Sequence, residues 1–189
     1  SGKASNNMRE YFRVERYSAL WLSFLSMFIV GFFLIQSGCY REYDRGASAY
    51  GASLTVVISG IKSVDEVAYS VGEDHYVLRP KSPQNRLLVA KVVVANNRSA
   101  RSTMFVDERA AYLSDDKRNN FLLVDPYGAR EVVSASSESE NRYIPFLWGN
   151  IDLKENYQVE GWMVFESPPN PELTSFYWEQ ADPIRVPLN

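Results

Sequence analysis

The single histidine of this chain stands in the run Glu73-Asp74-His75, where metal binding or acid–base chemistry would first be sought. A divalent metal needs several such side chains converging on one point. Neighbouring residues of a β-strand point to opposite faces, so these three could not readily meet at one ion. A Ser-His-Asp hydrolase would have to use His75, and no serine here has the glycine pattern of a nucleophile elbow. We therefore expect a solvated turn and no catalytic residue.

A second acidic run, DDKRNN (115–120), resembles a calcium-binding loop only superficially. Such a loop has carboxylates at alternate positions and a glycine at its sharp turn, and this run has neither. We predict a charged hairpin turn instead. The chain also lacks a glycine-rich phosphate loop, paired cysteines at zinc spacing and a haem-attachment CxxCH. These observations predict a protein that is not an enzyme and holds no metal and no cofactor.

The charge is unevenly distributed along the chain. The formal net charge of the 189 residues is −3, although residues 1–16 hold four basic and two acidic side chains. The rest carries 16 basic and 21 acidic side chains, a net charge of −5. Nucleic-acid binding is not expected, because neutralising phosphates needs clustered Lys and Arg. A single cysteine, Cys39, permits no internal disulfide, which is ordinary for a bacterial periplasmic domain.

Residues 17–40 form a run of 24 residues without a charge, between Arg16 and Arg41. As a helix the run would be about 36 Å long, against a hydrocarbon core of about 30 Å. Lys and Arg are more frequent before the run than just after it, so residues 1–16 are expected to be a basic arm in the cytoplasm. We predict a single-pass transmembrane helix in the bacterial inner membrane, in contact with the lipid bilayer. The C-terminal domain would then be periplasmic.

Two alternatives describe the same run. A cleaved signal peptide also follows a basic segment, but its apolar stretch is usually about 7–15 residues long. Cys39 after Gln36-Ser37-Gly38 is similar to a lipoprotein cleavage site, although Gln36 stands where a leucine is usual. We interpret the run as an uncleaved anchor. A native mature chain that begins at Cys39 would contradict this interpretation.

After the anchor the apolar pattern changes to period two. Residues 41–51 are small and polar and are interpreted as a linker. Residues 86–96 are the strongest strand candidate, with four side chains expected to face a core: Leu88, Ala90, Val92 and Val94. Further strands are expected at 53–59, 75–80, 102–106, 110–115, 121–126, 157–167, 174–180 and 183–188. With no helical periodicity after residue 40, the pattern predicts an all-β antiparallel sandwich over residues 52–189.

Several stretches carry a family resemblance: LLVAKVVVANNRSA (87–100), AYLSDDKRNNF (111–121), LKENYQVEGWMVFESPPN (153–170) and the closing PIRVPL (183–188). They are similar to an immunoglobulin-like domain of unknown function found behind signal peptides or membrane anchors in many bacterial envelope proteins. The family usually has Pro-Gly where this chain has Glu155-Asn156, and Asn tolerates the left-handed conformation. The resemblance implies an immunoglobulin-like sandwich in an extracytoplasmic location. It implies no catalytic residue.

Two regions could contact a partner. The apolar stretch YIPFLWGNI (143–151) has bulky residues on both faces, and two interpretations stay open: a core strand, or an exposed aromatic patch that includes Phe146, Leu147 and Trp148. In the anchor, four small residues could allow close packing on another membrane helix: Ser23, Ser26, Gly31 and Gly38.

We therefore expect a non-enzymatic subunit whose sandwich scaffolds or stabilises a larger membrane protein complex. Bacterial photosynthetic or respiratory assemblies are the favoured hosts, and the other subunits of that complex would be its partners. The alternative is a free-standing envelope module that binds a small ligand, a peptide or a cell-wall polymer. That hypothesis expects a cleft lined by aromatic rings, from Tyr127, Trp148 and Tyr177.

Overall fold

The computed structural model describes residues 46–188, and the regular elements in this range are all β-strands. In chain order they are β1 (Ala47–Tyr50), β2 (Leu54–Val64), β3 (Val67–Val71), β4 (Asp74–Leu78), β5 (Arg86–Asn96), β6 (Arg101–Val106), β7 (Ala111–Asp115), β8 (Asn120–Leu122), β9 (Glu131–Val133), β10 (Gly149–Lys154), β11 (Gln158–Ser167), β12 (Leu173–Trp178) and β13 (Ile184–Pro187). Among these residues no helix is long and apolar enough to cross a membrane. The helix expected over 17–40 lies outside the described residues.

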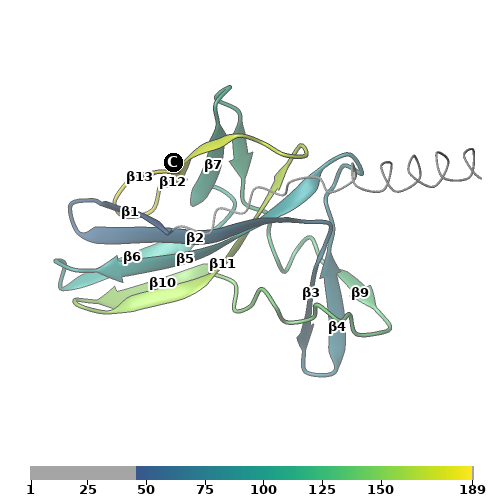
Figure 1. Ribbon diagram of the computed structural model, residues 1–189. Coiled ribbons are helices and arrows are strands. Elements are labelled where there is room, and N and C mark those ends of the chain that lie inside the picture. Colours follow the sequence, from purple (N-terminus) through teal and green to yellow (C-terminus); the bar gives the residue numbers. More distant parts are fainter. Residues whose placement is uncertain (1–45, 189) are drawn as a thin grey trace, which may run out of the picture. The chain divides into compact units, whose positions relative to one another are not determined.

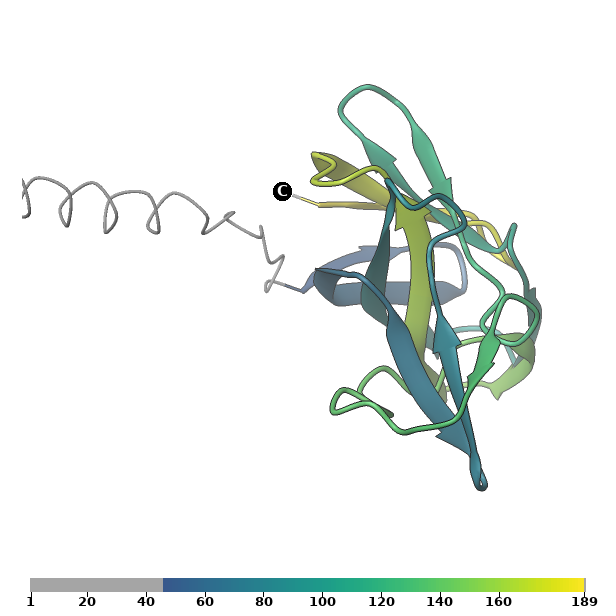
Figure 2. The same ribbon diagram turned by 90° about the vertical axis from the view of Figure 1, so that its right-hand side faces the viewer.

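The strands form two larger antiparallel sheets and two smaller ones. The first sheet has the order β1-β2-β5-β11 and the second the order β13-β12-β7-β8. The pair β6 and β10 packs with them, and β3-β4-β9 form a separate small sheet. In Figure 1 the second sheet lies above the first, and the small sheet projects downwards to one side. Figure 2 shows the small sheet again extending below the sandwich. The predicted all-β sandwich architecture is confirmed.

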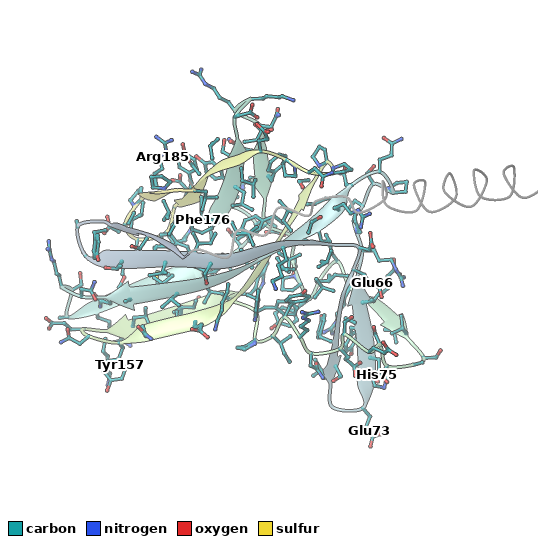
Figure 3. All side chains as sticks on the ribbon, in the orientation of Figure 1. Glu66, Glu73, His75, Tyr157, Phe176 and Arg185 are labelled. Atoms are coloured by element: carbon teal, nitrogen blue, oxygen red, sulfur yellow. The ribbon has the colours of Figure 1, made fainter. Side chains whose placement is uncertain are left out.

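The main core lies between the two larger sheets. The four side chains of β5 that were expected to face a core, Leu88, Ala90, Val92 and Val94, are 0–3% exposed and belong to it. Met104 of β6 and Leu153 of β10 belong to the same cluster, which is why the separate pair stays attached to the sandwich. Phe176 of β12 projects between the layers (Figure 3), with its ring edge-on to Phe165 of β11.

A second core lies beneath the small sheet. It gathers Val67, Tyr69 and Leu78 of β3 and β4, and the odd-numbered residues Leu87 and Val89 of β5. Successive side chains of a strand point to opposite faces. One end of β5 therefore supplies the main core with its even positions and the second core with its odd positions. This double burial explains why residues 86–90 form a nearly continuous apolar run.

Three details of the sequence interpretation need correction. Residues 47–50, expected to be part of the linker, form β1 and pair with β2 over Thr55–Ile58. Strands β3, β9 and β10 were not predicted. The pair Asn96-Asn97 predicts a turn after β5 that could use positive φ, because asparagine tolerates it, but neither residue is among those with positive φ. Asn156, by contrast, has φ 65°, so the left-handed conformation expected for the Glu155-Asn156 turn is confirmed.

The run 115–120 forms the β7–β8 hairpin turn, as predicted. The Asp115 carboxylate accepts hydrogen bonds from the backbone N–H of Lys117 (3.0 Å) and from the backbone and side chain of Asn119 (2.8 and 2.7 Å). Burial alone would raise the pKa of Asp115, but these hydrogen bonds lower it below its usual value. The carboxylate thus holds the turn closed.

Glu166 of β11 fixes the β4–β5 loop in the same way. Its oxygens accept the backbone N–H groups of Lys81 and Ser82 (both 3.1 Å) and the side-chain amide of Asn85 (2.8 Å). Burial acts to raise the pKa of Glu166, and the hydrogen bonds, which prefer the ionised form, bring it below its usual value. The loop between the small sheet and β5 is therefore tied to the first sheet by one carboxylate.

We predict that, when Glu166 is replaced by Gln, the domain loses less stability at acidic pH than the wild type does. A carboxyl whose folded-state pKa is lowered stabilises the fold above its unfolded pKa, and this contribution is lost as the pH falls through the folded pKa. At pH 7 the variant should be about 1 kcal/mol less stable than the wild type. Between pH 7 and pH 3 its free energy of unfolding should fall by less than that of the wild type. Thermal unfolding at a series of pH values measures both effects. Glu160→Gln, which breaks only the surface ion pair with Lys91, is the control and should cost at most a few tenths of a kcal/mol at pH 7.

Candidate partner-binding face

The small sheet has one face whose inner half is buried and whose outer half is open. In antiparallel register Tyr69 stands opposite Tyr76, which stands opposite Val132, so these side chains share a face. The period of two adds Val71 to it. Tyr69 is buried in the second core, whereas Val71 is 54% exposed and Val132 is 76% exposed. Apolar side chains therefore continue from the core onto the surface.

The loop that follows β8 brings two more side chains to this face, Tyr127 and Arg130. It begins where the backbone N–H of Val124 donates to Val164 O of β11 (2.8 Å). The Asp125 carboxylate accepts the N–H of Tyr127 (2.8 Å), and the buried Tyr69 hydroxyl donates to Pro126 O (2.6 Å). These bonds join the loop to the first sheet and to β3. The loop is therefore held in place before it reaches Arg130.

Arg130 is half-buried and packed among tyrosines. Its guanidinium carbon lies 3.9 Å from the centre of the Tyr76 ring and 6.0 Å from that of Tyr127, and a guanidinium N–H reaches the Tyr69 hydroxyl at 3.5 Å. A cation over an aromatic face is attracted by the ring quadrupole. The hydrogen bond with Tyr69 raises the pKa of Arg130, while burial raises that of Tyr69. Arg130 thus stays charged and Tyr69 neutral.

Phe146 completes the face from the segment between β9 and β10. Its ring is edge-on to Tyr69 (centroids 5.0 Å apart) and to Tyr127 (6.0 Å). The segment is fixed to β11, because Trp162 N–H donates to Pro145 O (2.8 Å) and Leu147 N–H donates to Trp162 O (2.9 Å). Phe146 therefore has a defined position although it lies outside the regular strands.

We call this set the arginine–tyrosine face; its members are Val71, Tyr76, Tyr127, Arg130, Val132 and Phe146. It contains three of the seven large apolar side chains that are exposed within residues 46–188: Val71, Tyr127 and Val132. Aromatic residues and Arg are enriched at the centres of protein–protein contacts. Asp74, which stands opposite Val71 and two residues before Tyr76, brings one carboxylate to the edge of the face, 3.4 Å from the Tyr76 hydroxyl. The six members themselves carry no nucleophile, so the chemistry of the face is that of contact and charge pairing.

The structure separates the residues expected to contact a partner. Phe146 is half-buried and belongs to the face. Leu147 is 3% exposed in the main core, which agrees with the core interpretation for this residue and not with the exposed patch. Trp148 is half-buried and packs against the main core. The anchor residues Ser23, Ser26, Gly31 and Gly38 lie outside the described residues.

Both interpretations of residues 143–151 therefore hold in part. Tyr143 is buried in the second core and Leu147 in the main core, while Pro145 is exposed and Phe146 reaches the surface. The segment crosses from one core to the other along β11. Bulky residues on both of its sides follow from this position.

His75 forms a contact that the sequence analysis did not foresee. Its Nδ1 lies 2.6 Å from the Glu140 carboxylate, which belongs to the loop 134–142. Figure 3 shows Glu73 at the tip of the β3–β4 turn, away from His75. Asp74 instead lies 3.4 Å from the Tyr76 hydroxyl. Within residues 46–188 no group of three or more His, Cys, Asp or Glu side chains could hold a metal ion.

The three rings expected to line a ligand cleft contact different partners. Tyr127 meets Phe146 at the small sheet, and Trp148 packs on the main core. Tyr177 lies on β12 of the second sheet and stacks on Tyr112, with ring centroids 4.6 Å apart. Of these three rings, Tyr127 belongs to the arginine–tyrosine face.

Sequence reasoning did not identify Arg130 or Tyr76 as members of a site. The alternation in VAYSV (67–71) and HYV (75–77), with a Val-Gly-Glu-Asp turn between them, is a usable hairpin signal for Tyr76. Arg130 carries no such signal, because a loop fixed by distant hydrogen bonds positions it. Its neighbours in the sequence do not reveal that a tyrosine from β4 lies beneath it.

We predict that Gly161→Ala displaces Phe146. A Cβ at Gly161 would lie 2.8 Å from Leu147 N and 3.1 Å from its Cα, and these backbone atoms cannot rotate away. The expected cost is about 1–3 kcal/mol, as for overpacking. Hydrogen exchange at the amides of Leu147 and Trp162 should accelerate. Gly46→Ala is the matched control, since its Cβ would meet only ordinary contacts at 3.8 Å and beyond; equal exchange in both variants would contradict the prediction.

Comparison with known proteins adds little beyond this geometry. No family model matches the chain, and a search of curated proteins finds no match. Among solved structures, the chain is similar to MPT63, a secreted protein from Mycobacterium tuberculosis, at 11% sequence identity and a TM-score of 0.40. The alignment covers 76% of this chain and 92% of that one. A likeness this weak carries no argument, so the class of the protein, an antiparallel all-β sandwich, rests on its own strand pairing.

Proposed function

We propose that this protein is a non-enzymatic, single-pass membrane subunit whose β-sandwich docks on other subunits of a larger membrane protein complex. The observation that carries the proposal is the arginine–tyrosine face, in which exposed apolar side chains surround a charged Arg130. The sandwich is proposed to be immunoglobulin-like and to stand on the periplasmic side of a bacterial inner membrane. Photosynthetic and respiratory assemblies remain the favoured hosts.

The roles of the buried and half-buried polar groups support a non-enzymatic function. Asp115 and Glu166 each accept hydrogen bonds from turn backbone, and the Asp182 carboxylate accepts the N–H of Ser53 (2.7 Å) and of Leu54 (3.1 Å). Asn96 is bonded in the same structural manner. A catalytic group needs a reactive atom free to meet substrate, and these groups are already bonded to the fold.

The apolar run 17–40 supports the membrane location, and it gives the proposal a second contact. A helix beside another membrane helix packs through small residues such as Gly31. The anchor would bring the domain to the complex, and the face would select where the domain docks. Two weak contacts on one chain strengthen the overall binding, because once the first contact has formed the second is intramolecular.

Purification in mild detergent tests this function. The chain should elute with other membrane subunits at a mass well above its own 21.6 kDa. We predict that Gly31→Leu weakens the association while the sandwich keeps its strand circular dichroism. If association survives that change, the folded domain alone makes the contact. A wild-type chain that elutes alone as a monomer would overturn the proposal.

A further inference from the structure

We infer that the arginine–tyrosine face takes a carboxylate of a partner protein, and that Arg130 is the residue that pairs with it. The inference rests on the proposed docking function and specifies the chemistry of the docked segment: an apolar stretch of another subunit that carries Asp or Glu. Among the other arginines near the small sheet, Arg79 and Arg86 form ion pairs, and Arg142 of the loop 134–142 lies over the Tyr143 ring (5.7 Å).

The first argument is the contrast between Arg130 and the two arginines Arg79 and Arg86. Arg79 pairs with Glu66 (3.1 Å) and Glu131 (2.7 Å), and Arg86 pairs with Asp65. Arg130 forms no ion pair with residues 46–188; its contacts there are the rings of Tyr76 and Tyr127 and the hydroxyl of Tyr69. A half-buried guanidinium has five N–H donors, and one tyrosine hydroxyl engages only part of them. The face therefore offers an unmatched charge with donors to spare.

The second argument is preorganisation. The Tyr76 ring at 3.9 Å holds the guanidinium plane, and the loop that carries Arg130 is bonded to β11 and to Tyr69. An arginine that is already ordered loses little side-chain freedom when a carboxylate binds. The exposed Val71, Tyr127 and Val132 around it would be covered by an apolar partner, which removes water from the ion pair. Direct carboxylate pairing then gives both orientation and specificity.

The observations favour a protein carboxylate over a lipid phosphate. Binding to an anionic membrane surface needs several clustered Lys and Arg residues. Here the other arginine of the small sheet, Arg79, is already paired with Glu66 and Glu131, in a domain of negative net charge. A bilayer of anionic lipid would be repelled by these surroundings, whereas one carboxylate in an apolar segment would not. The small-sheet geometry thus suits a docked protein segment.

Carbodiimide cross-linking of the detergent-solubilised complex tests the inference with the variant Arg130→Lys. The carbodiimide converts a partner carboxyl into an O-acylisourea, the lysine amine introduced at position 130 displaces the urea, and an amide bond forms. We expect an intermolecular product joined at residue 130 to an Asp or Glu of the partner, identified by mass spectrometry. The wild type should give no product there, because arginine does not react. Arg185→Lys is the matched control, since Arg185 also lies over a tyrosine (Tyr177, 5.8 Å) but on the second sheet.

Charge reversal supplies the second arm. Arg130→Glu should reduce co-purified partner at least tenfold, whereas Arg185→Glu should not, with strand circular dichroism unchanged in both. If the complex stays intact with the charge at position 130 reversed, the inference falls and the docking function stands. If Arg130→Glu releases the partner but Arg130→Lys gives no cross-link, the anion is not a carboxylate, as for a lipid phosphate, and the inference also falls. A wild-type chain that elutes alone overturns the docking function and the inference together.

Discussion

Trp178→Ala should lower the free energy of unfolding of the domain by about 3–5 kcal/mol. Trp178 is the largest fully buried side chain within residues 46–188, and it is 0% exposed in the main core. It stands on the central strand β12, opposite Ala111 of β7 and Ile184 of β13. Removing an indole from this position leaves a cavity that three paired strands cannot close. Since domains are stable by only about 5–15 kcal/mol, this single change takes a large share of the total.

Thermal unfolding followed by strand circular dichroism measures the effect, and the midpoint should fall by about 10–15 °C. Trp178→Phe is the matched control for packing. It removes the hydrogen bond from Nε1 to Gln180 O (2.8 Å), but that carbonyl still accepts the N–H of Asp182 (2.6 Å). The cost of the Phe variant should therefore stay near 1–2 kcal/mol. Equal losses in the two variants would show that the hydrogen bond, and not the filled volume, is what matters.

The long strands could be predicted from the sequence because burial imposes a period of two on them. β5 and β11 pair over Arg86–Ala95 and Gln158–Ser167, and their apolar alternation is visible without any structure. The alternation at Val159, Met163 and Phe165 follows from the same cause. A one-residue slip would turn every such side chain to the wrong face, so register and pattern fix each other. Strands could therefore be predicted where burial against one core determines the alternation of apolar and polar residues.

The short strands could not be predicted, because pairing rather than burial defines them. β1 has four residues, which are alternately half-buried and exposed. It is a strand because it pairs with β2. β9 has three residues, all exposed or half-exposed, and pairs only with β4 within the described sheets. Neither carries enough apolar pattern to distinguish a strand from a loop. Their strand character is a tertiary property.

The candidate site was only partly predictable for the same reason. Phe146 was identified because its segment has bulky residues on both sides, a pattern that no ordinary surface strand shows. The cause is that residues 143–147 connect the two cores along β11, and Gly161 leaves the space for this close approach. The sequence Glu160-Gly161-Trp162, within the family-like stretch 153–170, thus has a packing role. Arg130 joins the site through contacts that no local pattern records.

The second large effect is expected at Asn96, a fully buried polar residue at the end of β5. Its amide nitrogen donates to Ser99 O (2.8 Å) and Leu153 O (3.0 Å), and its side-chain oxygen accepts the N–H of Ser99 (3.0 Å). Its backbone is bonded to Tyr157 and Asn156 as well. The side chain therefore joins the β5–β6 turn to β10, and the backbone of the same residue joins β5 to the turn that follows β10. Asn96→Leu keeps the approximate size but removes the partner of the buried Leu153 carbonyl and of the part-buried N–H and C=O of Ser99, and should cost about 2–4 kcal/mol.

Asn96→Asp separates the hydrogen bonds from the shape. In this variant one side-chain oxygen still accepts the Ser99 N–H, but an ionised carboxylate would face two carbonyl oxygens. At pH 7 it should therefore be the less stable of the two Asn96 variants. Repulsion and burial raise the folded-state pKa of such a carboxyl above its unfolded value. Protonation restores one donor, so the deficit relative to wild type should shrink as the pH falls from 7 towards 5. Thermal unfolding across this range measures it. Asn97→Asp, one residue on and exposed, is the control: the Asn97 amide bonds the Thr55 hydroxyl, which can donate to a carboxylate instead, so this variant should change little. A deficit at position 96 that does not vary with pH would contradict the assignment of the two carbonyls to its amide.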